Sequence, residues 1–263
     1  MSVIKIIVAT HKKFVMPQDK ELYLPVHVGC EGKKDLGFQG DNTGDNISVL
    51  NPYYCELTGL YWAWKNLECD YLGLVHYRRY FTKRTEVYNE SINIDDVILD
   101  KDDIEKMLEV SNVIVPKKRK YYIETLYSHY AHTLDGTHLN LARKMIEMKS
   151  PEYLSSFDKV MKQRSGYMFN MFIMKKELAD DYFTWLFPIL DSMYECMDLS
   201  GLTAFEARLF GRVSELLFNV WLVKNNLTPK EVPFMYMEKV NLLKKAKSFL
   251  MAKFFGKKYG QSF

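Results

Sequence analysis

The stretch YLGLVHYRRYF at residues 71–81 carries the clearest fold signal in the sequence, because an apolar run ends abruptly in polar and cationic residues. A short, continuous apolar run is typical of a strand that is buried on both faces of a parallel sheet. Parallel sheets bind ligands outside the carboxyl ends of their strands. The stretch therefore predicts a central strand that places His76, Arg78 and Arg79 at a binding edge.

The segments around this strand alternate between strand-like and helix-like patterns, which predicts an α/β fold with a mainly parallel sheet flanked by helices. An amphipathic helical pattern begins at Pro52, and proline suits a first helical turn. Pro25 cannot donate to a strand ladder, so its strand is expected at an edge or to be irregular. The other expected strands are 3–9, 22–28, 112–116 and 167–174, and the other expected helices are 102–110, 175–194 and 203–224.

The composition favours one large soluble domain. Of the 263 residues, 48% are hydrophobic and 26% are charged, and the net charge of +3 does not indicate a nucleic-acid-binding protein. The four cysteines lack the close spacing of metal or redox pairs, so we expect free thiols in a reducing, cytoplasmic compartment. No apolar run approaches the ~18 residues of a membrane span. The high aromatic content, 14%, suits stacking on sugars and bases as well as core packing.

Two further polar segments follow predicted strands. Strand 3–9 leads directly into Thr-His-Lys-Lys, and the loop GDNTGDNIS at 40–48 precedes the helix that begins at Pro52. Asp and Asn side chains in such a loop could bind ribose, base or sugar hydroxyls, although ordinary Asx-rich turns have the same composition. The candidate substrate-binding residues in these segments are Thr10, His11, Asn42 and Asn46, with Asp41 and Asp45 as candidate acids.

Arg78 and Arg79 are candidates for phosphate binding, because guanidinium groups bind phosphate oxygens in a bidentate manner. Together with His76 they could neutralise a pyrophosphate leaving group without a metal. The alternative is that they form ion pairs with acids at the sheet edge, such as Asp70 or Glu56.

Glu206 has two possible roles. Thr203 and Glu206 match the capping box, in which the two side chains satisfy free amides at the start of a helix. By helical phase, Glu206 also lies on the side of the apolar stripe, where a carboxylate could act as a general base. Arg212 is a candidate substrate-binding residue of the same helix, or one half of a solvated i, i+3 pair with Glu215.

His129, His132 and His138 resemble a loose metal set, but no fourth ligand is evident. We expect them to form, with neighbouring tyrosines, either an acceptor-binding wall or core packing. The triplet DKD at 100–102 has the form of a metal-binding D-x-D motif, but it opens a predicted helix and is better interpreted as an N-cap.

The chain resembles a bacterial family long known as a domain of unknown function, whose members are regarded as capsular or exopolysaccharide glycosyltransferases. The resemblance covers nearly the whole sequence. The segments that carry it are IKIIVATHKKF (4–14), LPVHVG (24–29), DLGFQGDNTGDNIS (35–48), NPYYCELTGLYWAWKN (51–66), YLGLVHYRRYF (71–81), MFNMFIMKKEL (168–178), FGRVSELLFNVWL (210–222) and AKFFGKKY (252–259).

The resemblance implies a GT-A-like nucleotide-sugar fold, which usually carries D-x-D and a divalent metal where this chain has His76-Tyr77-Arg78. This departure puts dependence on Mn²⁺ or Mg²⁺ in doubt, a divalent metal stays an open alternative, and no cofactor is assigned. The resemblance also puts strand 167–174, with Asn170, on the acceptor side together with His129, and makes Glu206 the first candidate base, ahead of Asp41 and Asp45.

The implied reaction is transfer of a hexosyl group, with galactofuranosyl as the family association, from a UDP-sugar to a hydroxyl of a lipid-linked oligosaccharide. Two alternatives remain open. One is a sugar nucleotidyltransferase, although its glycine-rich phosphate loop and acid pair are not evident. The other is a non-catalytic carbohydrate-binding or assembly subunit.

The sequence divides into a catalytic domain at 1–237 and a basic segment at 238–263, in which seven lysines follow Glu238 without any acidic residue. One helical side of this segment would be apolar, as in helices that lie on membrane surfaces. A terminal helix packed on the domain is the alternative. We expect a peripheral protein on the inner face of the bacterial plasma membrane. The apolar side consists of Leu242, Leu243, Ala246, Phe249, Leu250 and Phe254.

Flotation with liposomes tests this membrane prediction. The full chain should bind anionic vesicles in a salt-sensitive manner, because each lysine near an anionic surface contributes about 1 kcal/mol. A version that ends at Glu238 should lose this binding. Equal binding by both versions, or no preference for anionic over neutral lipid, would contradict the prediction.

Overall fold

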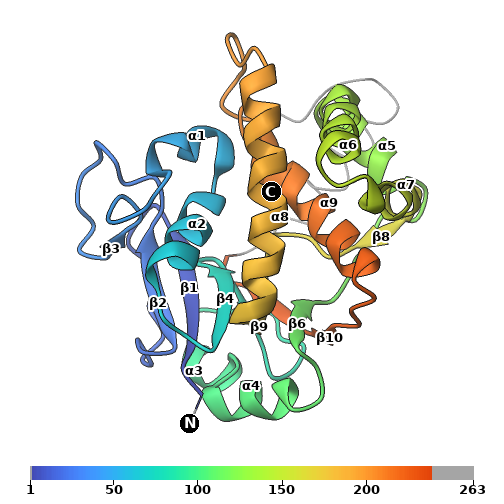
Figure 1. Ribbon diagram of the computed structural model, residues 1–263. Coiled ribbons are helices and arrows are strands. Elements are labelled where there is room, and N and C mark those ends of the chain that lie inside the picture. Colours follow the sequence, from blue (N-terminus) through green and yellow to red (C-terminus); the bar gives the residue numbers. More distant parts are fainter. Residues whose placement is uncertain (1, 239–263) are drawn as a thin grey trace.

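A mixed nine-stranded sheet forms the centre of the computed structural model, which describes residues 2–238 (Figure 1). Its main path has the order β10-β6-β9-β4-β1-β2-β3, and β5 and β11 extend it beside β4. The strands are β1 (Ile4–Thr10), β2 (Tyr23–His27), β3 (Gln39–Gly40), β4 (Tyr71–His76), β5 (Arg79–Phe81), β6 (Val113–Pro116), β9 (Phe172–Lys175), β10 (Lys230–Val232) and β11 (Phe234–Tyr236).

The strands on the β1 side of the sheet are all parallel. β1 pairs in parallel with β2 and β4, β2 pairs in parallel with β3, and β9 is antiparallel to both β4 and β6. The predicted mainly parallel α/β sheet is thus confirmed. Ala9 lies opposite His76 in the register of β1 and β4, so the polar residues that follow both strands meet at one edge.

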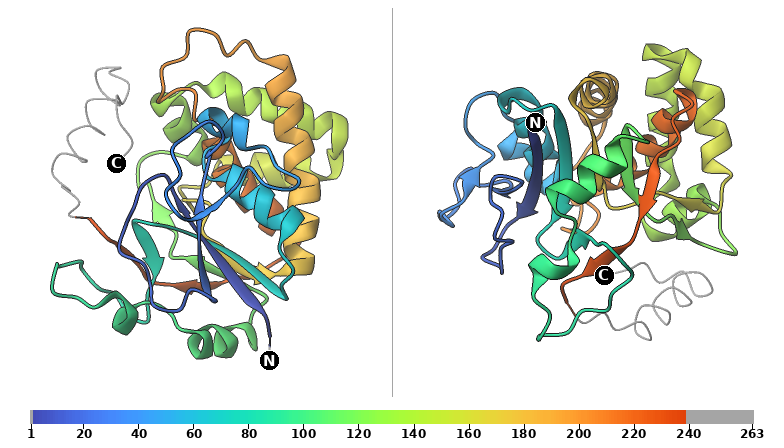
Figure 2. Two further views of the ribbon diagram at one scale, coloured as in Figure 1. Left: turned by 90° about the vertical axis from the view of Figure 1, so that its left-hand side faces the viewer. Right: turned by 90° about the horizontal axis from the view of Figure 1, so that it is seen from below.

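Helices cover the sheet and build a second, all-helical group beside it (Figures 1 and 2). α2 packs on β1, α8 packs on β4 and β9, α6 and α7 pack on α9, and α5 packs on α6 and α7. None of the described helices could cross a membrane. The helices are α1 (Asn51–Tyr54), α2 (Leu57–Asn66), α3 (Ile94–Val97), α4 (Lys101–Leu108), α5 (Leu126–Thr133), α6 (Gly136–Lys149), α7 (Leu154–Met161), α8 (Lys176–Cys196) and α9 (Leu209–Lys224), and the short strands β7 (Arg119–Lys120) and β8 (Ser165–Gly166) pair beside them.

The helix predicted from Pro52 is broken. It forms α1 and α2, because Cys55 adopts φ 54° and ψ −130°, a conformation that no helix accommodates. The Asn51 side chain donates to the Cys55 carbonyl at 2.8 Å and to Thr58 Oγ1 at 3.2 Å, which stabilises the break. The break turns Glu56 away from the regular helical path.

Two other predicted boundaries were wrong. The helix expected from residue 203 begins at Leu209, and the strand expected from residue 167 begins at Phe172. In the second case Phe169 and Asn170 have φ values of 76° and 54°, which is incompatible with an extended strand. Pro25 lies inside β2, next to β1, but β3 pairs only with Val26 and His27. Pro25 therefore has a strand neighbour on the β1 side and none on the β3 side, so it has an edge position on the β3 side alone.

Other local predictions were correct. Asp100 is the N-cap of α4 and forms a reciprocal capping box with Asp103, so this triplet has a structural role. All four cysteines are free thiols. Residues 239–263, including the predicted membrane-binding segment, lie outside the described residues.

Asp41 anchors the polar loop to the sheet and to α2. Its side chain is 0% exposed, and its two carboxylate oxygens accept four hydrogen bonds. The donors are Gly29 N at 2.6 Å, Cys30 N at 3.1 Å, Ser48 Oγ at 2.5 Å and Thr58 Oγ1 at 2.6 Å. Both oxygens are therefore used to hold the loop in place.

Replacing Asp41 should lower stability more than replacing its neighbour in the same loop. Asp41→Asn places an amide among four donors, and a loss of about 2–4 kcal/mol in the free energy of unfolding is expected from urea denaturation. The matched control is Asp45→Asn, because Asp45 is exposed and its side chain accepts, from residues 2–238, only a 3.2 Å bond from the Tyr61 hydroxyl. Similar midpoints for the two variants would refute the anchoring role.

Candidate active site

The carboxyl ends of β1 and β4 form one polar edge. Thr10 at the end of β1 is 0% exposed. Its hydroxyl donates to the Lys12 carbonyl at 2.6 Å and accepts from Lys12 N at 3.2 Å. Thr10 therefore shapes the turn that presents His11, whose ring lies edge-on to Tyr77 with 5.3 Å between centroids. Thr10 and His11 were both predicted to bind substrate here, and of the two His11 is exposed to solvent.

Positive charge gathers around His11. Partial burial lowers the pKa of His11, and Lys12, Arg78, Lys33 and Arg208 lower it further. These cations come from four different segments of the chain, so only the tertiary fold brings them together. Lys12 has one acidic neighbour, Glu238, at 3.5 Å. Such a concentration of cations outside parallel strands suits a diphosphate group.

Half-buried aromatic rings lie against this electropositive edge. Phe14 packs on Tyr77 and on Phe38, with ring centroids 6.0 Å and 5.7 Å apart. The Lys12 ammonium group lies 4.9 Å from the centre of the Tyr77 ring. The edge thus combines cations with flat apolar surfaces, the combination that binds a phosphorylated nucleoside.

Behind this edge, His76 is held in its neutral form. Burial lowers the pKa of His76 to about 4, and Arg79 and Arg78 contribute in the same direction while Glu56 opposes them. Nε2 of His76 lies 2.7 Å from the Phe169 carbonyl. Since a carbonyl only accepts, Nε2 carries the proton of the neutral ring.

Glu56 is half-buried and charged. Burial raises its pKa, but a hydrogen bond from Asn170 and the positive charge of Arg208 lower it, and the pKa lies below the ordinary value. Asn170 Nδ2 donates to Glu56 Oε1 at 2.8 Å. The break between α1 and α2 therefore delivers a carboxylate to the end of β4.

Asn170 is a scaffold residue. Its side chain is 5% exposed. Besides its bond to Glu56, it donates to the Gly211 carbonyl at 2.9 Å and accepts from Ser214 Oγ at 2.9 Å. Its amide is thus engaged by the protein, so the predicted contact with substrate is not supported by this geometry.

Backbone strain is concentrated around the same point. Cys55, Phe169 and Asn170 all have positive φ values, a conformation that costs about 1–3 kcal/mol for a residue other than glycine. All three flank Glu56 or His76. Strain of this kind persists only where the surrounding contacts enforce it, and it is common at functional sites.

Arg79 is a buried cation between two aromatic rings. Its side chain is 6% exposed, and its guanidinium carbon lies 4.4 Å from the centre of the Phe169 ring and 5.2 Å from that of Tyr236. Burial lowers its pKa. No described residue within 2–238 hydrogen-bonds Nε. Arg79 therefore supplies positive charge from behind the edge, whereas Arg78 lies at the edge itself.

The first turns of α9 complete the arrangement. The guanidinium of Arg212 lies 5.0 Å from the centre of the Phe205 ring. Burial raises the pKa of Glu215, with Glu56 acting in the same direction, while Arg212, the Phe169 amide and Arg79 act against it. The solvated-pair interpretation of Arg212 and Glu215 is thus wrong. We define the central polar cluster as Glu56, His76, Arg79, Arg208, Arg212 and Glu215.

Several predicted site residues lie outside this cluster. Asn42 accepts from the Cys30 thiol and donates to Glu31, both before the polar loop, whereas Asn46 bonds Gly44 and Ser48 within it. Asp41 and Asp45 belong to the same loop. Glu206 lies in the turn before α9, where its carboxylate accepts from Thr203 N at 3.1 Å and Thr203 Oγ1 at 2.8 Å. The predicted capping contacts of Glu206 therefore exist, although α9 starts after them.

His129 lies on α5, beside the cluster. Burial lowers its pKa to about 4, and the charges of Arg119 and Arg212 contribute. No group of three or more His, Cys, Asp or Glu side chains in residues 2–238 is arranged to hold a metal ion.

Sequence reasoning missed three members of the cluster. Glu56 was considered only as an ion-pair partner, because nothing in the sequence indicates the break at Cys55. Arg208 precedes the true start of α9, which was placed too early. Glu215 could have been found from its i, i+3 spacing to Arg212, had that helical face been recognised as partly buried.

Comparison with known proteins agrees with this geometry. No curated protein matches the sequence significantly. The chain is similar to a solved structure described as the WbbM bifunctional glycosyltransferase in its apo form, with 30% identity and a TM-score of 0.82. The match covers 90% of this chain but only 45% of the WbbM chain. The mainly parallel sheet and its helices thus form a GT-A-like α/β fold.

The model of a protein family described as the domain of unknown function DUF4422 matches residues 5–226. This range includes β1, the polar loop, β4, β9 and α9, and with them every residue of the central polar cluster. The chain belongs to the DUF4422 family, a glycosyltransferase-related family of GT-A-like fold.

Proposed function

We propose that this chain is a glycosyltransferase that moves a hexosyl group from a UDP-sugar to a hydroxyl group. The observation that carries this proposal is the fold match to a glycosyltransferase together with cations gathered at the carboxyl ends of β1 and β4. The match spans less than half of a protein described as bifunctional, so this chain corresponds to one part of such a protein.

In this proposal the donor lies across the edge formed by β1 and β4. The uracil base stacks among Phe14, Phe38 and Tyr77, and the diphosphate faces Arg78 and Arg208. Fixed cations at this position stabilise the negative charge that develops on the departing UDP. The buried charge of Arg79 adds to the same field. His76-Tyr77-Arg78 stands where the GT-A-like fold usually carries D-x-D, which supports phosphate neutralisation by arginine rather than by a metal.

Glu215 is the base that this geometry favours, if the reaction inverts the configuration of the sugar. The acceptor hydroxyl would lose its proton to the Glu215 carboxylate as its oxygen bonds the anomeric carbon. The bond from that carbon to the phosphate oxygen breaks at the same time, and its electron pair leaves with UDP. A raised pKa suits a proton acceptor that works near neutral pH. Glu206 is the alternative, because it precedes the same helix.

The finer assignments rest on the family resemblance. They are a galactofuranosyl donor, a lipid-linked oligosaccharide acceptor and a role in capsule or exopolysaccharide synthesis at the inner face of the plasma membrane. A product on a lipid carrier would fit the predicted basic segment after residue 237, because both would lie at the same membrane surface.

Arg78→Ala should weaken UDP binding without preventing folding, because Arg78 is half-buried at the edge. Loss of one or two charge-assisted hydrogen bonds corresponds to an increase of about 10- to 100-fold in Kd, measured by calorimetry. Wild-type binding should persist in EDTA. Arg84→Ala, at an arginine that is 79% exposed, is the control and should bind normally. A strict need for Mn²⁺ would contradict this arrangement.

Glu215→Gln should abolish most of the transfer activity while UDP still binds. A loss of about 10²–10⁴-fold in kcat is expected for removal of a general base. In the wild type the rate should fall as pH falls through the raised pKa of Glu215, because protonation removes the acceptor. The matched control is Glu206→Gln, which keeps its capping contacts. If only Glu206→Gln loses activity, Glu206 is the base instead.

A further inference from the structure

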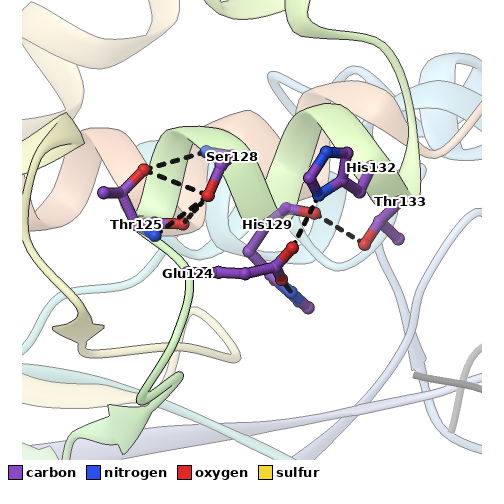
Figure 3. A network of polar contacts seen from close by, with 6 residues as sticks. All are labelled: Glu124, Thr125, Ser128, His129, His132 and Thr133. Atoms are coloured by element: carbon purple, nitrogen blue, oxygen red, sulfur yellow. Dashed lines mark hydrogen bonds and ion pairs between the residues drawn. The ribbon is translucent and has the colours of Figure 1, made fainter. Parts of the chain in front are cut away.

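A buried carboxylate on the helical side of the site binds two histidines (Figure 3). The Glu124 side chain is only 3% exposed. Its Oε2 lies 3.0 Å from Nδ1 of His129, and its Oε1 lies 2.6 Å from Nδ1 of His132. The histidines are three residues apart on α5, so they share one face of the helix. One carboxylate therefore orients both imidazole rings.

The start of α5 holds this arrangement in place. Thr125 and Ser128 form a reciprocal capping box directly after Glu124. Thr125 Oγ1 accepts from Ser128 N at 3.0 Å, and Thr125 N donates to Ser128 Oγ at 2.9 Å. In the next turn, Thr133 Oγ1 donates to the His129 carbonyl at 2.8 Å. Glu124 is thus fixed beside the first two turns of the helix (Figure 3).

The contacts with Glu124 leave one ring nitrogen of His132 at the surface. Glu124 is charged, because the two histidine contacts hold its pKa below the ordinary value although burial raises it. A charged carboxylate only accepts hydrogen bonds, so Nδ1 of each histidine is the donor. A neutral imidazole that donates from Nδ1 presents Nε2 as an acceptor. The His132 side chain is 49% exposed, and within residues 2–238 its only hydrogen bond is the one from Nδ1 to Glu124.

This group borders the central polar cluster. The ring of Tyr121 packs on His129, with 4.1 Å between ring centroids. Burial raises the pKa of Tyr121 to about 12, and the charges of Glu215 and Arg212 both act on it. Arg212 also acts on His129. The histidine pair and the proposed base therefore lie in one region of the fold.

We propose that His132, positioned by Glu124, binds a hydroxyl group of the acceptor glycan, with the hydroxyl as donor and Nε2 as acceptor. The inference rests on the proposed function, because it assumes that a glycan must lie beside the donor. Orientation of an imidazole by a buried carboxylate is the arrangement by which proteins fix the direction of Nε2. Burial of a carboxylate charge is costly without hydrogen bonds, and the two imidazoles satisfy it while one ring remains open to solvent.

The substitution His132→Asn distinguishes the role of Nδ1 from that of Nε2. The asparagine amide can still donate to Glu124 as Nδ1 does, but nothing replaces Nε2. The matched control is Thr133→Val, which removes the neighbouring bond to the His129 carbonyl and leaves both imidazoles intact. The acceptor probes are the octyl glycosides of common hexoses, used at a saturating concentration of UDP-sugar. Donor hydrolysis without acceptor and the Tm are measured for every variant.

His132→Asn should raise the KM for the glycoside about tenfold, the effect of losing one hydrogen bond to substrate. Its rate of donor hydrolysis and its Tm should match the wild type. Thr133→Val should change only the Tm. An unchanged KM for His132→Asn would overturn the inference. A fall in both the rate of donor hydrolysis and the Tm of this variant would also overturn it, and would assign His132 a structural role. Absence of both hydrolysis and transfer in the wild type would instead overturn the proposed function.

Discussion

The hydrogen bonds of one buried amide connect the parts of this site. Asn170 joins Glu56 at the break between α1 and α2 to Gly211 and Ser214 in the first turns of α9. The backbones of Phe169 and Asn170 both have positive φ values, directly before β9 begins at Phe172. Asn170 therefore links the helix that carries Glu215 to the turn that carries Glu56.

Charge burial is the second constraint on the site. Arg79 and Glu215 are withdrawn from water beside neutral His76 and charged Glu56. Placing ionised groups in such an environment costs free energy unless each has a partner of opposite charge or a hydrogen bond. The cluster contains both signs of charge, which offsets part of this cost. Excess positive charge remains at the outer edge, around His11 and Arg78, where an anionic ligand would complete the balance.

The helical group around α9 forms the other side of the site. It carries its own polar unit, in which Glu124 orients His129 and His132. The sheet edge and the helical group differ in chemistry, because the first offers cations and half-buried aromatic rings while the second offers an imidazole. This division matches a reaction in which a charged donor and an uncharged, hydroxyl-rich acceptor approach from different sides.

The sequence by itself determined the fold class and the sheet edge at which the polar residues after β1 and β4 gather. Apolar runs at β1 and β4 are buried on both faces of the sheet, and such runs are recognisable because burial demands continuous apolar residues. The polar residues after them, His11, His76 and Arg78, were placed correctly for the same reason. The capping contacts of Asp100 and of Glu206 with Thr203 were also predictable, since they depend on neighbours three residues away.

Only the tertiary structure decided which acids face that edge. Glu56 reaches the cluster because the helix breaks at Cys55. A hydrogen bond from the Asn51 side chain stabilises this break, and helix propensities do not predict it. The side chains of Asp41, a predicted candidate base, and Asn170, a predicted substrate-binding residue, form hydrogen bonds to segments distant in sequence. A polar side chain is free to bind a ligand only if the fold leaves it without a better partner, and partners are set by packing between elements rather than by the order of residues along the chain.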